Sequence, residues 1–282
     1  MKRTHGPAEI FGLPPSVKGL AQQAQENGYE CPFMKGTKCD KKSRLIKYPF
    51  GICSVIHSED NPVAICPNRF KQKNIIFRQI AKDIFGTIDN VIPLQEVSFG
   101  NIGTFDYILV KHKPVSYDID DFCALECQSD STTGTGGLVT AIKDFFKGTK
   151  IENKNYKFGM NTYNTIKLSF IQILIKGAVF ERWKKNMIWV LQRSLFTNMT
   201  DRFKLGDITF NKDQQNYFYI YDIALNKDIS EYTLELVEKK SSKIWGLLQA
   251  FQQIEVPDIE EIHKIIRKKL VNRQWDSNLK LT

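Results

Sequence analysis

Acidic and amide side chains occur in two apolar runs that have the pattern of neighbouring strands. Asp106 lies near the start of the run 105–110, and Glu126 and Gln128 lie two residues apart in the run 122–128. Because successive side chains of a strand alternate between faces, Glu126 and Gln128 point the same way and Cys127 points away from them. Carboxylate and amide oxygens are the ligands that Mg²⁺ prefers. The pattern therefore predicts a Mg²⁺ site, with ordinary hydrogen-bonded acids at strand ends as the alternative.

Glu96 adds a further carboxylate through the expected register of a hairpin. Residues 91–97 and 104–111 have the pattern of two strands joined by a turn. If the hairpin turns about Asn101, Glu96 faces Asp106 on the same side of the sheet. Two adjacent carboxylates repel each other unless a cation lies between them. The pair therefore supports the metal site, although a slip of one residue in register would separate it.

A second candidate metal site is made of cysteines. Four of the six cysteines fall in residues 31–66, with the spacing C-x7-C-x13-C-x12-C, and these are Cys31, Cys39, Cys53 and Cys66. This loop-rich stretch cannot bury enough apolar surface to hold its own shape. Four thiolates around one tetrahedral ion, Zn²⁺ or a single iron, would stabilise it. The alternatives are four unrelated buried cysteines, or His57 in place of one ligand.

The chain carries an excess of positive charge. It has 40 Lys and Arg against 31 Asp and Glu, a formal net charge of +9. Such an excess favours a polyanionic partner, and nucleic acid before a membrane surface. The cysteine segment is rich in lysine, so Lys42 and Arg44 are candidate DNA contacts, with Arg69, Arg182 and Arg193 as equal alternatives. A solvated charged face is the other interpretation.

The remaining pattern predicts the elements that position these residues. An arm and a helix occupy residues 1–30, with the helix over 16–24, and the metal-binding subdomain follows over 31–66. The core domain, residues 67–282, is expected to hold a mixed sheet with helices on both faces, an α/β or α+β fold. Expected strands beyond the first three are 186–192, 216–224 and 232–237, and expected helices are 68–86, 138–146, 161–185, 241–253 and 258–270. The last two helices are expected to pack on the core, with pairing to a second subunit as the alternative.

Membrane insertion and secretion are not expected. The N-terminal residues contain no apolar run typical of a signal peptide. The most apolar segment, 166–183, is interrupted by five charged or amide residues and is too short to span a bilayer. We therefore expect a protein of the cell interior, whose cysteines are thiols or metal ligands rather than disulfides.

Together these patterns resemble the PD-(D/E)xK nuclease superfamily. Asp106 on the second strand and Glu126-Cys127-Gln128 on the third match its motif, although Phe105 replaces the usual proline and Gln128 replaces the usual lysine. With the four-cysteine segment upstream, the chain resembles the NotI-like type II restriction endonucleases, whose four cysteines hold one iron ion. The resemblance covers most of the chain, from about residue 8 to the last helices.

The resemblance implies Mg²⁺-dependent, sequence-specific hydrolysis of double-stranded DNA, at a GC-rich palindrome, by a homodimer in the cytoplasm of a prokaryotic cell. Asp106 and Glu126 would bind Mg²⁺, with Gln128 and Glu96 as the other catalytic residues. The cysteines would hold structural iron, with Zn²⁺ as the alternative. Two other functions remain open. One is a repair or recombination nuclease of the same superfamily without sequence specificity. The other is a non-catalytic, metal-clamped DNA-binding protein.

Overall fold

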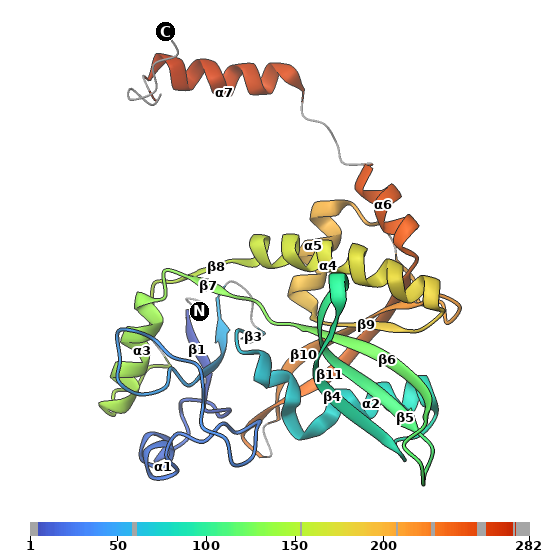
Figure 1. Cartoon of the computed structure of the whole chain (residues 1–282). Helices are drawn as coiled ribbons and strands as arrows, with labels where there is room; N and C mark the ends of the chain where they lie inside the picture. The colour runs from blue at the N-terminus through green and yellow to red at the C-terminus, as the bar shows by residue number, and fades with distance from the viewer. Residues whose placement is uncertain are drawn as a thin grey trace.

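A six-stranded mixed sheet forms the centre of the protein (Figure 1). The computed structural model describes residues 5–57, 61–152, 154–206, 208–226, 229–252, 258–272 and 274. The outer ends of the predicted arm and core domain, residues 1–4 and 275–282, lie outside the described residues, as does residue 253 at the end of one predicted helix. The strand order in the sheet is β11-β10-β9-β6-β5-β4.

The sheet combines an antiparallel meander with a parallel centre. Its strands are β4 (Val91–Phe99), β5 (Gly103–His112), β6 (Ile119–Gln128), β9 (Met187–Gln192), β10 (Asn216–Asn226) and β11 (Glu231–Ser242). Strands β4, β5 and β6 are antiparallel, β6, β9 and β10 are parallel, and β11 returns antiparallel to β10. The predicted mixed sheet is therefore confirmed.

Helices cover both faces of the sheet, as the α/β pattern predicts. On one face lie α4 (Thr162–Trp183), α5 (Arg193–Phe203) and α6 (Ile244–Gln252), and on the other lie the 3-10 helix η1 (Pro67–Asn74) and α2 (Ile75–Phe85). Strand β9 shows why two layers are needed: Trp189 and Leu191 pack toward α4, while Ile188 and Val190 pack toward α2. A strand that is apolar on both sides requires cover on both sides. No helix within the described ranges has the length and apolar character needed to cross a bilayer.

Two predicted helices differ in detail from the structure. The segment 68–86 is divided at Gln72 and Lys73, whose backbone angles are not helical, so α2 begins only at Ile75. The N-terminal helix α1 (Leu20–Glu26) begins later than residue 16. Helix α5 lies in a stretch for which the pattern predicted no element.

A smaller three-stranded sheet lies beside the central sheet. It contains β1 (Gly6–Ile10), β2 (Ile52–Ile56) and β3 (Val63–Ala64), so residues of the predicted arm and of the cysteine segment pair with each other. Helix α3 (Gly136–Phe146) packs against it and completes its core, and the short strands β7 (Thr132–Thr133) and β8 (Gly159–Met160) flank this excursion of the chain. We call residues 5–66 together with α3 the N-terminal part.

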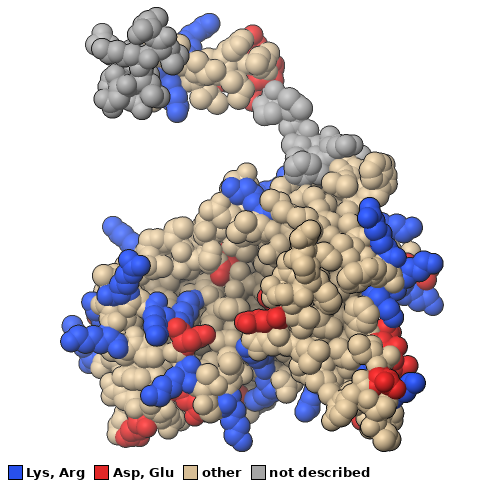
Figure 2. Space-filling view, viewed as in Figure 1, with Lys and Arg blue, Asp and Glu red and all other residues tan. Residues whose placement is uncertain are grey.

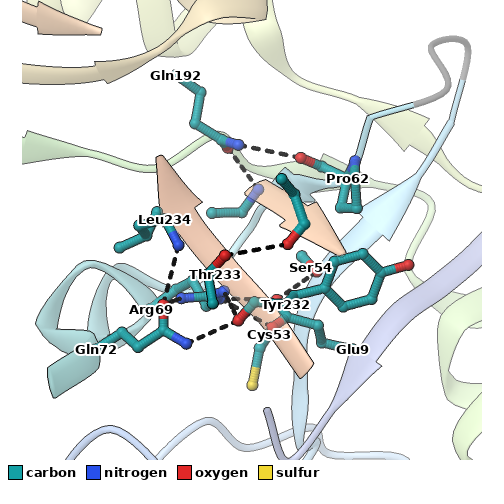
Figure 3. A network of polar contacts seen from close by, with 12 residues as sticks. Glu9, Cys53, Ser54, Pro62, Arg69, Gln72, Gln192, Tyr232, Thr233 and Leu234 are labelled. Carbon is teal, nitrogen blue, oxygen red and sulfur yellow. Dashed lines mark hydrogen bonds and ion pairs between the residues drawn. The ribbon is translucent and has the colours of Figure 1, made fainter. Parts of the chain in front are cut away.

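A buried polar network joins the N-terminal part to the central sheet (Figure 3). Arg69 of η1 pairs with Glu9 of β1 through an Nε–Oε2 distance of 2.9 Å, and both side chains are fully buried. Ser54 donates to Glu9 at 2.6 Å. Arg69 also donates to Gln72 and to the carbonyl of Tyr232 in β11, at 2.9 and 3.0 Å. Because each charge has several partners, the network orients the two parts relative to each other.

The C-terminal helix α7 (Ile259–Val271) lies away from the rest of the protein (Figure 1). None of its residues is buried, whereas α6 contributes Ile244 and Leu247 to the core. The predicted core packing is therefore confirmed for α6 and wrong for α7. Asp258 caps α7 as predicted, by accepting a hydrogen bond from the backbone of Glu260 at 3.0 Å.

Candidate active site

The candidate site lies where the central sheet opens around Asp106. The pairing between β5 and β6 ends at Tyr107 and Leu125, one position before Asp106 and Glu126 would face each other. Two side chain–backbone hydrogen bonds replace it: the N–H of Cys127 donates to Asp106 Oδ2 at 2.9 Å, and the N–H of Asp106 donates to the Glu126 carboxylate. Each carboxylate is therefore held by the backbone of the neighbouring strand across the opening.

The β4–β5 hairpin has the register that the sequence predicts. Gln95 pairs with Tyr107 and Val97 pairs with Phe105, and the turn includes Asn101. Glu96 consequently lies at the position opposite Asp106, although the ladder skips this pair. Glu96 has φ 53°, a left-handed conformation that is uncommon for a residue with a side chain. Pairing is therefore interrupted at Asp106 both between β4 and β5 and between β5 and β6.

Glu126 is buried and contacts Lys176 of α4. The Nζ atom of Lys176 donates to Glu126 Oε1 and also to the carbonyl oxygen of Thr104, the latter at 2.7 Å. Burial raises the pKa of Glu126 to about 7, the charge of Asp106 adds to the rise, and Lys176 opposes it. A carboxyl group with this pKa changes its protonation state near neutral pH.

Gln128 points to the same side of the sheet as Glu126, as strand alternation predicts, and its amide is oriented by α4. Its Oε1 accepts a hydrogen bond from Ser169 at 3.0 Å, and its Nε2 donates to Gln172 at 3.3 Å. On the opposite side, Cys123, Leu125 and Cys127 pack in the core cluster toward α2, which confirms them as one apolar face.

The four predicted catalytic residues line one pocket of about 640 Å³ between the central sheet and the N-terminal part. We call it the carboxylate pocket. The sheet and α4 contribute Gln95, Glu96, Asp106, Tyr107, Glu126, Cys127, Gln128, Ser129 and Gln172, and the opposite wall contributes Met34, Asp40, Lys41, Cys66, Pro67, Asn68 and Lys71. Figure 2 shows a hollow with acidic side chains between the two parts and basic side chains around it. Tertiary structure therefore brings together residues from widely separated stretches of chain.

The four cysteines predicted as structural ligands lie in the N-terminal part and beside the carboxylate pocket. All four are free thiols; Cys53 is on β2 and Cys66 directly precedes η1. Burial raises the pKa of Cys31, and the neighbouring Cys39 and Cys66 raise it further; Cys53 is affected in the same way by burial and by Glu9, Cys66 and Cys39. The thiols are thus close enough to interact electrostatically.

The side chains of the two predicted metal sites do not have the arrangement of metal ligands in this structure. Across the residues that the structure describes, no group of three or more His, Cys, Asp or Glu side chains is arranged to hold a metal ion. The donor types nevertheless fit: hard oxygens gather in the carboxylate pocket, and thiols gather beside it. Both metal assignments therefore stay predictions.

The arginines and lysines considered as DNA contacts lie in different environments. Lys42 and Arg44 are exposed on the loop that follows Cys39. Arg69 is fully buried in its pair with Glu9, so it is not available to DNA. Arg193 is half exposed and pairs with Asp222 at 2.8 Å. The structure thus removes Arg69 from the candidates and leaves Lys42, Arg44 and Arg182 exposed.

Two lysines at the site were missed by the sequence pattern. Lys176 lies on the buried face of α4 with Ile173, Gly177 and Phe180, and this charged residue in an apolar stripe is the signal that could have found it. Lys71 reaches the carboxylate pocket from η1. No feature of the sequence distinguishes Lys71 from the other lysines around it.

Comparison with known proteins identifies one family. The family described as Restriction endonuclease NotI matches residues 16–234. This range includes the cysteine segment and every residue of the carboxylate pocket, and it ends within β11, before α6 and α7. No curated protein matches the chain.

Proposed function

The chain belongs to the NotI restriction endonuclease family, and we propose that it is a type II enzyme that uses Mg²⁺ to hydrolyse phosphodiester bonds of double-stranded DNA at a GC-rich palindrome. The observation that carries the chemistry is the convergence of Glu96, Asp106, Glu126 and Gln128 in one pocket. Three carboxylates and an amide in a basic protein suit a cation that in turn binds a phosphate.

Asp106 and Glu126 would hold the Mg²⁺ ion, with Glu96 beside them. The ion would polarise the phosphate and lower the pKa of a bound water. The reciprocal hydrogen bonds between β5 and β6 orient the two carboxylates before any ligand arrives. Gln128 has no acidic proton, so its role is to orient a water or ligand through an amide that Ser169 and Gln172 hold in place.

Cys31, Cys39, Cys53 and Cys66 would hold one structural iron, with Zn²⁺ as the alternative. The ion would stabilise a wall of the carboxylate pocket, because Cys66 lines that pocket and Asp40 and Lys41 follow Cys39 directly. Lys42 and Arg44, on the same loop, would then be positioned for contact with DNA.

A palindromic target implies a dimer with two-fold symmetry, and α7 is our candidate for part of its interface. Its exposed apolar residues recur at helical spacing, at Ile259, Ile262, Ile266 and Leu270. Its first turn carries Glu260 and Glu261 and its last turn Lys268 and Lys269, so two antiparallel copies would place opposite charges side by side. A helix of this length with no buried face is marginal in water without a partner.

A DNA digest tests the proposed function. The purified chain is incubated with long unmethylated DNA of known sequence, with and without Mg²⁺, beside Glu126→Gln and Glu126→Ala. We expect discrete Mg²⁺-dependent fragments that both variants fail to produce while they still bind DNA. Glu235→Gln, outside the pocket on β11, is the control and should cut like the parent.

Other outcomes would favour the alternatives. A smear of fragments would indicate a nuclease without sequence specificity. Tight binding without cleavage would indicate a non-catalytic DNA-binding protein. Cleavage by Glu126→Ala at the parent rate would refute the assignment of the catalytic residues.

A further inference from the structure

A second cavity of about 520 Å³ adjoins the carboxylate pocket. The two share four lining residues, Met34, Lys71, Gln95 and Tyr107. The second cavity continues between the loop 33–37 and α2 on one side and the β4–β5 hairpin on the other. We call it the side groove. Because the pockets share walls, a chain-like ligand can extend from one into the other.

The charges of the two pockets are opposite in character. Three carboxylates of the sheet lie in the carboxylate pocket, whereas the described residues lining the side groove include Lys35, Lys71 and Arg78 and no Asp or Glu. Within the described chain, no ion pair involves any of these three cations. A groove with cations and no counter-charge favours an anionic ligand.

Lys71 lies at the junction of the two pockets, and its ammonium group contacts uncharged side chains. Its Nζ atom is 3.4 Å from the Met34 sulfur and 5.9 Å from the centroid of the Tyr107 ring. The side chain is half-buried, so it loses part of its hydration, and none of the described carboxylates forms an ion pair with it. An arriving phosphate would supply that anion.

The direction of Lys71 follows from the buried network on the other side of η1. Arg69 and Gln72 are both held toward β11 by the carbonyl of Tyr232, at 3.0 and 2.7 Å. Arg69, Phe70 and Gln72 are buried, so among residues 69–72 it is Lys71 that lines the pocket. The same ion pair that joins the two parts therefore also positions a cation beside the carboxylates.

The apolar wall of the side groove suits the sugars and bases between phosphates. Phe77 and Tyr107 meet edge to face, with ring centroids 4.8 Å apart, and Phe33 also lines the groove. Cations interleaved with aromatic rings are typical of surfaces that bind one nucleic-acid strand.

We propose that the DNA strand that is cut continues from the carboxylate pocket into the side groove, where Lys71 binds the phosphate next to the scissile one and Arg78 and Lys35 bind beyond it. This inference rests on the proposed nuclease function and adds the path of the strand. In this proposal Lys71 contacts a DNA phosphate and not the metal ion. Phosphates are the same in every sequence, so loss of Lys71 should weaken binding of all DNA sequences equally.

The test measures binding of a mixed-sequence DNA duplex as a function of salt, in the Glu126→Gln background so that no cleavage occurs. We expect Lys71→Ala and Arg78→Ala each to make the slope of log K against log salt shallower by about one. Lys71→Arg should restore the slope, because it restores the charge. Lys73→Ala is the matched control: Lys73 is two residues away, exposed, and paired with Glu231 at 3.2 Å outside the groove.

The proposed path of the strand would be overturned if the slope of log K against log salt were the same for Lys71→Ala and Arg78→Ala as for Lys73→Ala. If the parent cuts DNA in that case, the proposed function stands and only the side groove fails. If the parent neither binds nor cuts duplex DNA, both proposals fail together.

Discussion

The ammonium group of Lys176 contacts the carboxylate of Glu126 in the interior of the protein, where both side chains are almost completely excluded from solvent. Lys176 comes from α4 and Glu126 from β6. A helix that covers one face of the sheet therefore orients a side chain that lines the carboxylate pocket. Lys176 does not line the carboxylate pocket. If Glu126 binds Mg²⁺ as proposed, Lys176 is a positioning residue that acts through Glu126.

Lys176→Met should lower the rate of Mg²⁺-dependent cleavage by about 10- to 100-fold, the usual effect of removing a residue that orients a metal ligand. The lost cation also favours protonated Glu126, so part of the activity should return at higher pH or higher Mg²⁺ concentration. Lys167→Met, at an exposed position of the same helix, is the control. Loss of activity that neither pH nor Mg²⁺ restores would indicate a purely structural role.

Cleavage should depend on pH through Glu126, whose pKa is raised to about 7 by burial, with the Asp106 charge adding to the shift. Only the ionised carboxylate is a good Mg²⁺ ligand, so the rate should rise as pH increases through about 7. Protons and Mg²⁺ compete, so more Mg²⁺ should move the midpoint to lower pH. Initial rates measured against pH at two Mg²⁺ concentrations check this. If the pH midpoint of the rate does not change with Mg²⁺ concentration, the transition belongs to another group.

Arg69→Met should destabilise the fold by about 3–5 kcal/mol, because it leaves Glu9 buried without its charged partner. The double variant Glu9→Met/Arg69→Met should recover part of the loss, since it removes both charges. Urea denaturation of the full chain measures the free energy of unfolding. Arg193→Met, which breaks the half-exposed pair with Asp222, is the control and should cost about 1 kcal/mol or less. Equal effects of the two single variants would contradict the role of the network.

Elemental analysis should find about one iron or zinc atom per chain, bound by the cysteine segment. Serine at Cys31, Cys39, Cys53 or Cys66 should lower the metal content, and a strong chelator should lower the melting temperature of the parent. Serine at Cys127, on β6 and outside the segment, should leave the metal content unchanged. If the metal content is the same in all five variants, the four cysteines are not the metal ligands.

In sedimentation equilibrium, the parent should be a dimer, and the double variant Ile262→Lys/Ile266→Lys should be shifted toward monomer. Both isoleucines are about half exposed on α7, so lysine there should not disturb folding of the monomer. Val115→Lys, at a highly exposed position of the β5–β6 loop, is the control. A dimer that persists in the double variant would place the interface elsewhere.

Local sequence patterns determined much of the sheet and the type of its chemistry. The turn at Asn101 sets the β4–β5 register, because a hairpin of known turn position has one pairing. Strand alternation places Glu126 and Gln128 on the side of α4, with Cys127 on the other side. Both rules depend on residues close in sequence, and both predictions are confirmed.

Tertiary structure alone decided how the site is built. The ladder between β5 and β6 ends at Tyr107, Lys176 reaches Glu126 from 50 residues away, and Lys71 enters the pocket because Arg69 is anchored elsewhere. Helix α7 has the same amphipathic pattern as a core helix, yet nothing in the described chain buries it. A periodic pattern states which face of an element is apolar; which partner covers that face, and which polar group meets a buried charge, depends on contacts between segments that are far apart in sequence.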